Sequence, residues 1–191
     1  METTVVIAED ELITRMDIGE ILEVAGYKVV GLAKDGLEAV DFCRKEKPDL
    51  AILDIKMPLL GGLEATKIIK KENLAKCVVL LTAFSDAEYI EKARDLGVMT
   101  YLVKPFDEST LIPAIEIALG KQKEMDKMQE ELETMSKKLD DRKFVERAKG
   151  LLMDEHNFSE DQAYKALRKL AMDKRMSISE LSRLLIQSKK D

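Results

Sequence analysis

The sequence predicts an α/β fold with a five-stranded parallel sheet, followed by an all-helical tail. Within residues 1–120, five short apolar runs alternate with segments whose apolar residues recur every three or four positions. Such alternation of strand and helix patterns is typical of a parallel sheet covered by helices on both faces. After residue 120 the apolar runs disappear, no proline occurs, and only the helical spacing continues.

The elements of the first part follow from local signals. Strands are predicted over residues 3–8, 28–33, 50–54, 77–82 and 98–103. Helices are predicted over residues 12–25, from the cap Asp35 to before Pro48, from Gly61-Gly62 onward, over 87–96 and over 107–119. Gly26 and Gly97 follow two of these helices, where a glycine ends a helix readily. The run 50–54 is apolar up to a single carboxylate, Asp54, which indicates a strand buried on both faces.

Polar residues stand where the predicted strands end. Glu9 and Asp10 follow the first strand, Asp54 and Thr82 end the third and fourth, and Lys104 ends the fifth. The carboxyl ends of parallel strands share one edge of the sheet, where ligands bind. Carboxylate oxygens there can hold Mg²⁺, while a hydroxyl and an ammonium group can hold phosphoryl oxygens. The sequence therefore predicts Asp54 as a phosphoacceptor carboxylate.

These elements, together with Asp54-Ile-Lys-Met-Pro58 and Lys104-Pro-Phe106, resemble the receiver domain of bacterial two-component response regulators. The resemblance implies a flavodoxin-like sheet of order 2-1-3-4-5, a sensor histidine kinase as partner, and a cis Lys104–Pro105 bond. It also implies Mg²⁺ contact by Asp10, Asp54 and the backbone carbonyl of Lys56, with Glu9 acting through water. At the position of Glu9 the family often has Asp, and at the position of Gly61 it usually has Asp. The glycine at position 61 weakens the start of the helix that follows.

The resemblance further implies a conformational switch. Thr82 moves toward the phosphoryl group, and Tyr101 rotates into the space that Thr82 leaves. The alternative for Tyr101 is a half-buried strand aromatic, and we favour the switch. Phe84, two residues after Thr82, either tunes water access to the phosphoryl group or only packs.

Residues 121–141 carry a short heptad pattern. Its apolar positions, in steps of three and four, are Met125, Met128, Leu132, Met135 and Leu139. This heptad pattern, called the seam below, predicts either a helix that packs on its own chain or the dimer seam of a parallel coiled coil. We favour a homodimer that forms on phosphorylation, because three methionines in five positions give adaptable rather than fixed packing.

Residues 142–191 predict a module of three helices. Ser159 to Gln162 and Ser177 to Glu180 are capping boxes that begin the second and third helices. The segment carries 12 Lys and Arg against 8 Asp and Glu, a net of +4, whereas residues 1–141 carry a net of −10. Two basic stripes interrupted by methionine suit RNA phosphates and bases; they comprise Arg142, Lys149 and Met153, and Lys165, Arg168, Met172 and Arg175.

The runs Arg147 to Met153, Ala163 to Arg168 and Ala171-Met172 resemble the ANTAR domain, an RNA-binding module of antitermination regulators. The resemblance implies binding to paired stem-loops in nascent leader RNA, which prevents transcription termination. The whole chain is similar to ethanolamine-utilisation regulators of this type. Gly150 lies in the middle of a predicted helix, where either RNA approaches the backbone or a neighbouring helix packs closely.

The resulting prediction is a phosphorylation-activated, RNA-binding response regulator in a bacterial cytoplasm, divided into residues 1–120, 121–141 and 142–191. One histidine, two distant cysteines and no long apolar run argue against a zinc site, a histidine-based triad and a membrane span. We expect no enzyme activity beyond phosphorylation and dephosphorylation of the receiver itself. Two alternatives remain. One is a DNA-binding transcription factor; Arg183 is the single basic residue of helix 178–186, which makes this helix a poor recognition helix. The other is an output module that docks onto a partner protein.

Overall fold

A computed structural model describes residues 2–83 and 87–188. For residues 87–90 it describes the backbone only. It contains five strands: β1 (Thr4–Ala8), β2 (Lys28–Ala33), β3 (Leu50–Asp54), β4 (Cys77–Ala83) and β5 (Thr100–Lys104). Its helices are α1 (Leu12–Val24), α2 (Gly36–Glu46), α3 (Gly62–Lys71), α4 (Ala87–Asp95), α5 (Glu108–His156), α6 (Glu160–Asp173) and α7 (Ile178–Gln187). The chain divides into two compact units, Met1–Asp126 and Lys127–Asp191.

The first unit is built on one parallel sheet of order β2-β1-β3-β4-β5, as predicted. The strand β1 pairs with β2 and β3, so that Ile7 lies beside Leu32 on one side and Ile52 on the other. All five residues of β3 are buried. The order of the sheet therefore brings the ends of β1, β3 and β4 together at the centre of one edge.

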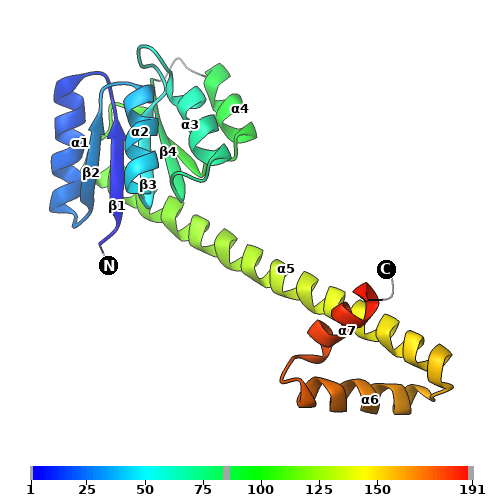
Figure 1. Ribbon diagram of the computed structural model, residues 1–191. Helices are drawn as coiled ribbons and strands as arrows, with labels where there is room; N and C mark the ends of the chain where they lie inside the picture. The colour runs from blue at the N-terminus through cyan, green and yellow to red at the C-terminus, as the bar shows by residue number, and fades with distance from the viewer. Residues whose placement is uncertain (1, 84–86, 189–191) are drawn as a thin grey trace. The chain divides into compact units, whose positions relative to one another are not determined.

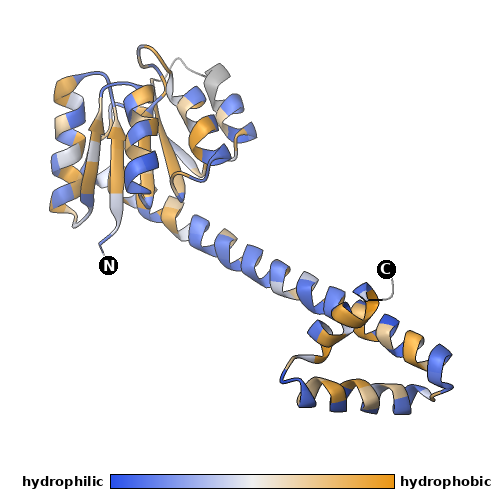
Figure 2. Cartoon of the chain, viewed as in Figure 1, coloured by the Kyte–Doolittle hydropathy of each residue, from blue (hydrophilic) through white to orange (hydrophobic). Residues whose placement is uncertain are grey.

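The sheet separates two apolar cores, because successive side chains of a strand point to opposite faces. Val6 and Ala8 of β1 belong to the core that α2, α3 and α4 cover. Val5 and Ile7 belong to the other core, which α1 and the first turns of α5 cover. The helices lie on the two sides of the strands in Figure 1, and the strands are almost wholly apolar in Figure 2. Both faces of the sheet are thus closed, and only its edges remain for a site.

Two glycines allow helices to begin directly against the edge that carries Asp54. A Cβ atom on Gly62 would lie 2.1 Å from the carbonyl oxygen of Asp54, and a Cβ atom on Gly36 would lie 2.3 Å from that of Leu60. The Asp35 carboxylate accepts hydrogen bonds from the amides of Leu37 and Glu38 and caps α2. In contrast, the N-cap of α3 is Gly61, which offers no side-chain cap, as the departure at this position implies. The loop after Asp54 is therefore held by backbone packing.

Helix α5 is a single helix of 49 residues, Glu108–His156. The sequence predicts three separate pieces here, the last receiver helix, the seam helix and the first module helix, and in the structure they are continuous. The physical reason is that most residues between 120 and 156 are good helix formers, and Gly120 and Gly150 cost only about 1 kcal/mol each. Much of the helix beyond Gly120 is hydrophilic (Figure 2).

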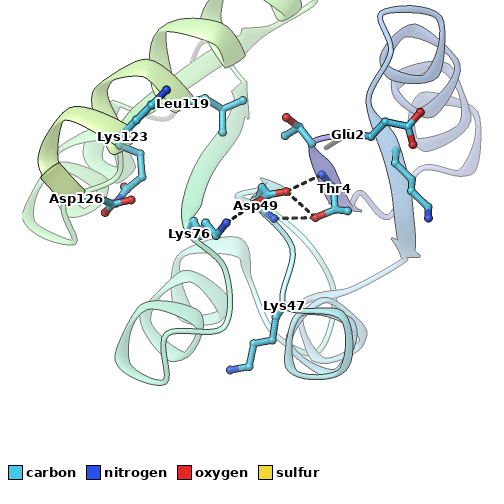
Figure 3. Close-up of a pocket in the computed structure, with 11 residues that line it drawn as sticks. Glu2, Thr4, Lys47, Asp49, Lys76, Leu119, Lys123 and Asp126 are labelled. Carbon is cyan, nitrogen blue, oxygen red and sulfur yellow. Dashed lines mark hydrogen bonds and ion pairs between the residues drawn. The ribbon is translucent and has the colours of Figure 1, made fainter.

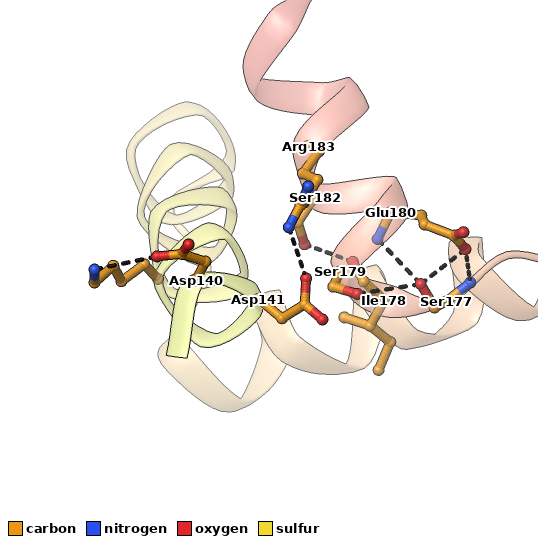
Figure 4. A network of polar contacts seen from close by, with 9 residues as sticks. Asp140, Asp141, Ser177, Ile178, Ser179, Glu180, Ser182 and Arg183 are labelled. Carbon is orange, nitrogen blue, oxygen red and sulfur yellow. Dashed lines mark hydrogen bonds and ion pairs between the residues drawn. The ribbon is translucent and has the colours of Figure 1, made fainter. Parts of the chain in front are cut away.

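The second unit packs the C-terminal part of α5 against α6 and α7. Its core consists of Ala148, Leu167, Ala171, Leu181 and Ile186. Both predicted capping boxes are present, at Ser159 and at Ser177. Arg183 of α7 donates to Asp141 of α5 at 3.0 Å (Figure 4) and lies over the ring of Phe144, 4.6 Å from its centroid. These contacts attach α7 to α5.

The described helices include none that is long and apolar enough to cross a membrane.

Candidate functional site

The strand ends bring one cation and two acidic side chains into direct contact. Nζ of Lys104, the last residue of β5, lies 2.5 Å from Oε2 of Glu9 and 3.2 Å from Oδ2 of Asp54. Glu9 directly follows β1 and is 1% exposed, and Asp54 ends β3 and is 7% exposed. The peptide bond from Lys104 to Pro105 is cis, as the resemblance implies. The structure thus assembles three of the five predicted strand-end residues into one ion-pair cluster.

Three carboxylates at this edge have the donor set of a magnesium site. Glu9, Asp10 and Asp54 each offer one oxygen, and these oxygens lie within 4.8 Å of one another. Hard divalent cations prefer such oxygen ligands, and Mg²⁺ keeps several of its waters. Asp10 is exposed at the mouth of the cluster, so an ion can reach it from solvent. The residues present therefore fit Mg²⁺, and Asp10 and Asp54 would be its ligands.

Burial disfavours the ionised form of the Asp54 carboxyl. It raises the pKa of this group to about 6, with the neighbouring charges of Glu9 and Asp10 acting in the same direction and Lys104 opposing them. Burial also disfavours the charge on Lys104, but its contacts with Glu9 and Asp54 outweigh this effect and raise its pKa. A cation placed among these carboxylates would lower the pKa of Asp54 and keep it ionised and nucleophilic.

Thr82 lies beside this cluster. It is 1% exposed, and its hydroxyl donates to the Ala83 carbonyl at 3.2 Å. In the parallel register Asp54 pairs with Leu81, so Thr82 stands one residue farther along the neighbouring strand. The hydroxyl therefore lies at the same sheet edge as the carboxylate, as predicted.

Two further predicted residues lie farther out. Tyr101 on β5 is 43% exposed, so this structure shows the ring in an outward position. Lys56 is exposed in the loop after β3. Phe84 falls outside the described residues.

One contact of this site was not predicted from the sequence. A guanidinium N–H of Arg15, on α1, donates to the backbone carbonyl of Glu9. It thereby holds the turn that joins Glu9 to Asp10. The sequence carries no signal for this bond, because its acceptor is a backbone carbonyl.

A large cavity of the first unit lies at the opposite edge of the sheet (Figure 3). It has a volume of about 710 Å³, and Thr4, Asp49, Lys76 and Leu119 are among its lining residues. The Asp49 carboxylate accepts hydrogen bonds from the amide and the hydroxyl of Thr4, at 2.9 and 3.0 Å, and from Lys76, at 2.7 Å. These contacts hold the starts of β1, β3 and β4 together, and none of the predicted site residues lines the cavity.

The five seam residues form an exposed apolar stripe on α5. Met125 and Met128 are each 54% exposed, Leu132 63%, and Met135 and Leu139 each 61%. Isolated exposed apolar side chains are common, but five at heptad spacing on one helix are a surface on which a second helix can pack.

The predicted RNA-binding residues fall into two groups in the structure. Arg142, Lys165 and Arg168 are exposed, and Lys165 forms a surface ion pair with Asp161 at 2.5 Å. Lys149, in contrast, is only 7% exposed and lies between two carboxylates.

The other two candidates, Gly150 and Met153, follow Lys149 on α5. Met153 is half-buried, and a Cβ atom on Gly150 would meet no atom within 4 Å. Close helix packing therefore does not explain the glycine, and open space beside it remains for a ligand.

Comparison with known proteins matches both parts of the chain. Residues 5–116 match the family model of the response regulator receiver domain, and residues 133–186 match that of the ANTAR domain. The chain is similar to the transcriptional regulatory protein PdtaR of Mycobacterium tuberculosis strain H37Rv, with 45% identity over 184 residues, 96% of this chain and 89% of that protein.

Solved structures match the first unit. They include the signal receiver domain of a modulated diguanylate cyclase from Desulfovibrio desulfuricans (30% identity, 64% of this chain and 98% of that one, TM-score 0.59). The chemotaxis protein CheY4 of Vibrio cholerae matches at 28% identity, 62% and 99% coverage and a TM-score of 0.58. Neither of the two matched family models is that of an enzymatic domain. The chain belongs to the response regulators, and it joins a receiver domain to an ANTAR domain.

Proposed function

We propose that this response regulator is activated by phosphorylation of Asp54, dimerises through α5, and binds tandem hairpins in nascent leader RNA to prevent transcription termination. The observation that carries the proposal is the contact of Lys104 with Glu9 and Asp54 in a chain that also contains an ANTAR domain. A sensor histidine kinase is the proposed phosphoryl donor, and the bacterial cytoplasm, where nascent RNA is made, is the proposed location.

The receiver chemistry follows from the positions of its side chains. A carboxylate oxygen of Asp54 attacks the phosphorus of a phosphohistidine, the P–N bond breaks, and an acyl phosphate forms. Mg²⁺ bound at Asp10, Asp54 and the Lys56 carbonyl would offset the charge of the phosphoryl oxygens. Lys104 pairs with one of these oxygens and Thr82 donates to another. Reorientation of Thr82 is the proposed start of the switch, with Tyr101 turning inward behind it.

The proposed route from receiver to output runs along α5. We divide the chain into a receiver over 1–120, a linker helix over 121–141 and an RNA-binding module over 142–191. The exposed stripe from Met125 to Leu139 would pair with the same stripe of a second copy. Pairing places two modules on one frame, so that two hairpins bind with a high effective concentration. A seam of about two heptads is marginal by itself, which makes pairing dependent on the receiver.

The basic side chains of the second unit favour RNA over a DNA major groove. Arg142, Lys165 and Arg168 are accessible on α5 and α6. The DNA-binding alternative needs a recognition helix with free side chains, and α7 has Arg183 as its one basic residue. Arg183 is engaged by Asp141 and Phe144 (Figure 4), so α7 is poorly suited to contact base edges. The likeness to ethanolamine-utilisation regulators stays a prediction about the inducing signal.

The test measures binding of a tandem-hairpin leader RNA with and without beryllofluoride, a phosphoryl mimic, in buffer that contains Mg²⁺. We expect the mimic to shift the protein from monomer to dimer in sedimentation and to tighten RNA binding. Asp54→Asn is the matched control, because it keeps the side-chain shape and removes the acceptor. Equal RNA affinity and unchanged sedimentation with the mimic would refute the gating. Preference for duplex DNA over the hairpin would favour the alternative function.

A further inference from the structure

We propose that Lys149 is a positioning residue, which ties α5 to the start of α6 and sets the RNA-binding surface without touching RNA. This inference rests on the proposed RNA-binding function and replaces the sequence-based prediction that Lys149 contacts RNA. The remaining cations of the two stripes, Arg142, Lys165 and Arg168 among them, then carry the phosphate contacts.

The contacts of Lys149 are internal to the second unit. Its Nζ atom lies 2.8 Å from Oε2 of Glu146, one turn earlier on α5, and 2.7 Å from Oε1 of Glu160, the first residue of α6. The side chain of Lys149 is 9% exposed, whereas those of Glu146 and Glu160 are 55% and 71% exposed. The lysine is thus largely buried, whereas its two carboxylate partners remain exposed to solvent.

Glu160 is well placed to receive this lysine. It stands in the first turn of α6, where the helix dipole favours a carboxylate, directly after the Ser159 cap. The connection from α5 is short: α6 begins at residue 160, and Asn157 turns the chain with a left-handed φ of 53°. The Lys149–Glu160 contact therefore closes this turn and fixes the direction in which α6 leaves α5.

Charge balance argues against a phosphate contact by Lys149. A lysine that neutralises a phosphate gains affinity by releasing counterions, and this gain is absent where two carboxylates already neutralise the lysine. Moving the ammonium group to a phosphate would break both contacts and expose the buried stem. Lys165 differs, since it and Asp161 are 73% and 71% exposed, and such surface pairs exchange partners at little cost.

The experiment compares Lys149→Met with Arg168→Met in the full chain, using the tandem-hairpin RNA at several salt concentrations. Loss of one phosphate contact lowers the slope of log K against log salt by about 1, whereas loss of a positioning contact weakens binding uniformly. We expect Lys149→Met to weaken binding several-fold with an unchanged slope, and Arg168→Met to lower the slope. Lys149→Arg, which keeps a cation between the two carboxylates, should restore binding. A lower slope for Lys149→Met would overturn the proposal.

Glu160→Gln gives a second and opposite test. Removing a negative charge near a polyanion should strengthen binding if Lys149 were an RNA ligand, because the lysine would become free. The positioning role predicts weaker binding instead, and tighter binding would overturn it.

Thermal unfolding of the double variant separates this inference from the proposed function. If the wild-type chain binds no hairpin, RNA binding itself fails, yet the contact remains testable. If the two side chains interact, the double variant Lys149→Met, Glu160→Gln should be no less stable than Lys149→Met alone. Stability losses that add up over the two substitutions would overturn the inference.

Discussion

Replacing Asp54 by asparagine should stabilise the metal-free receiver at neutral pH. The folded state raises the pKa of Asp54 from 3.8 to about 6, chiefly by burial. Such a carboxyl binds its proton more tightly in the folded than in the unfolded chain. The contribution of Asp54 to the stability of the fold is therefore fully present below the pKa of the unfolded chain, and it is lost as the pH rises through the pKa of the folded chain. An asparagine side chain does not titrate, so the Asp54→Asn variant avoids this loss.

The size of the effect follows from the shift of the pKa. About two pKa units correspond to roughly 3 kcal/mol at a pH of about 7.5, where the loss is complete. At a pH of about 4.5 the difference should fall to about 1 kcal/mol, because Asp54 is then protonated in most of the folded molecules. Lys104, whose side chain is 25% exposed, keeps its 2.5 Å contact with Glu9 in the variant, so its charge is not left unpaired.

Hydrogen–deuterium exchange of peptides from β3 and β4, in buffer with EDTA, measures the difference in unfolding free energy between wild type and Asp54→Asn. Because these strands belong to the receiver, the measurement reports on that part of the full chain. The amides of these central strands exchange through global opening of the sheet, so their protection reports the free energy of unfolding. Asp49→Asn is a contrasting control: burial disfavours its charge too, but hydrogen bonds from Lys76 and Thr4 hold its pKa below normal, and the change should destabilise the sheet. Equal protection of wild type and Asp54→Asn at neutral pH would refute the reasoning.

Three further outcomes test other parts of the structure. Mg²⁺ at 100 times its dissociation constant should stabilise the wild type by about 2.7 kcal/mol and the Asp54→Asn variant far less, as differential scanning fluorimetry can show. Gly62→Ala should destabilise the receiver by about 1–3 kcal/mol, because its Cβ would collide with the Asp54 carbonyl; protection unchanged from wild type in exchange experiments would contradict this. Gly150→Ala should stabilise the second unit by about 1 kcal/mol in thermal unfolding, since its Cβ meets open space; if RNA approaches this backbone, hairpin affinity should fall despite the added stability.

The sheet and its site were predictable because each depends on short-range patterns. Apolar runs that alternate with helical periodicity indicate strand and helix directly, and the parallel arrangement then requires that Glu9, Asp54, Thr82 and Lys104 share an edge. The contact of Arg15 could not be predicted in this way, because its partner is a backbone carbonyl, and no pattern of side chains indicates such a bond. The continuity of α5 was missed as well, since changes in composition along a chain do not require a break in the helix.

In the second unit, helical spacing did not predict which basic residues are exposed. Helical spacing places Arg142 and Lys149 on one face, and the sequence contains the same type of charge at both positions. The structure buries one and exposes the other, because α6 returns against α5 and brings Glu160 onto Lys149. Which basic residue can meet an RNA phosphate is decided by this return of the chain.

The order of elements, the edge that carries Asp54, the capping boxes and the heptad seam can all be read from the amino-acid sequence, since each is set by residues close in the chain or by the alternation of strand and helix. The pairing of the charges could be known only from the folded molecule. Lys104 joins Glu9 across 95 positions, and Arg183 joins Asp141 across 42. Contacts of this kind depend on how helices and strands pack, and local periodicity carries no information about them.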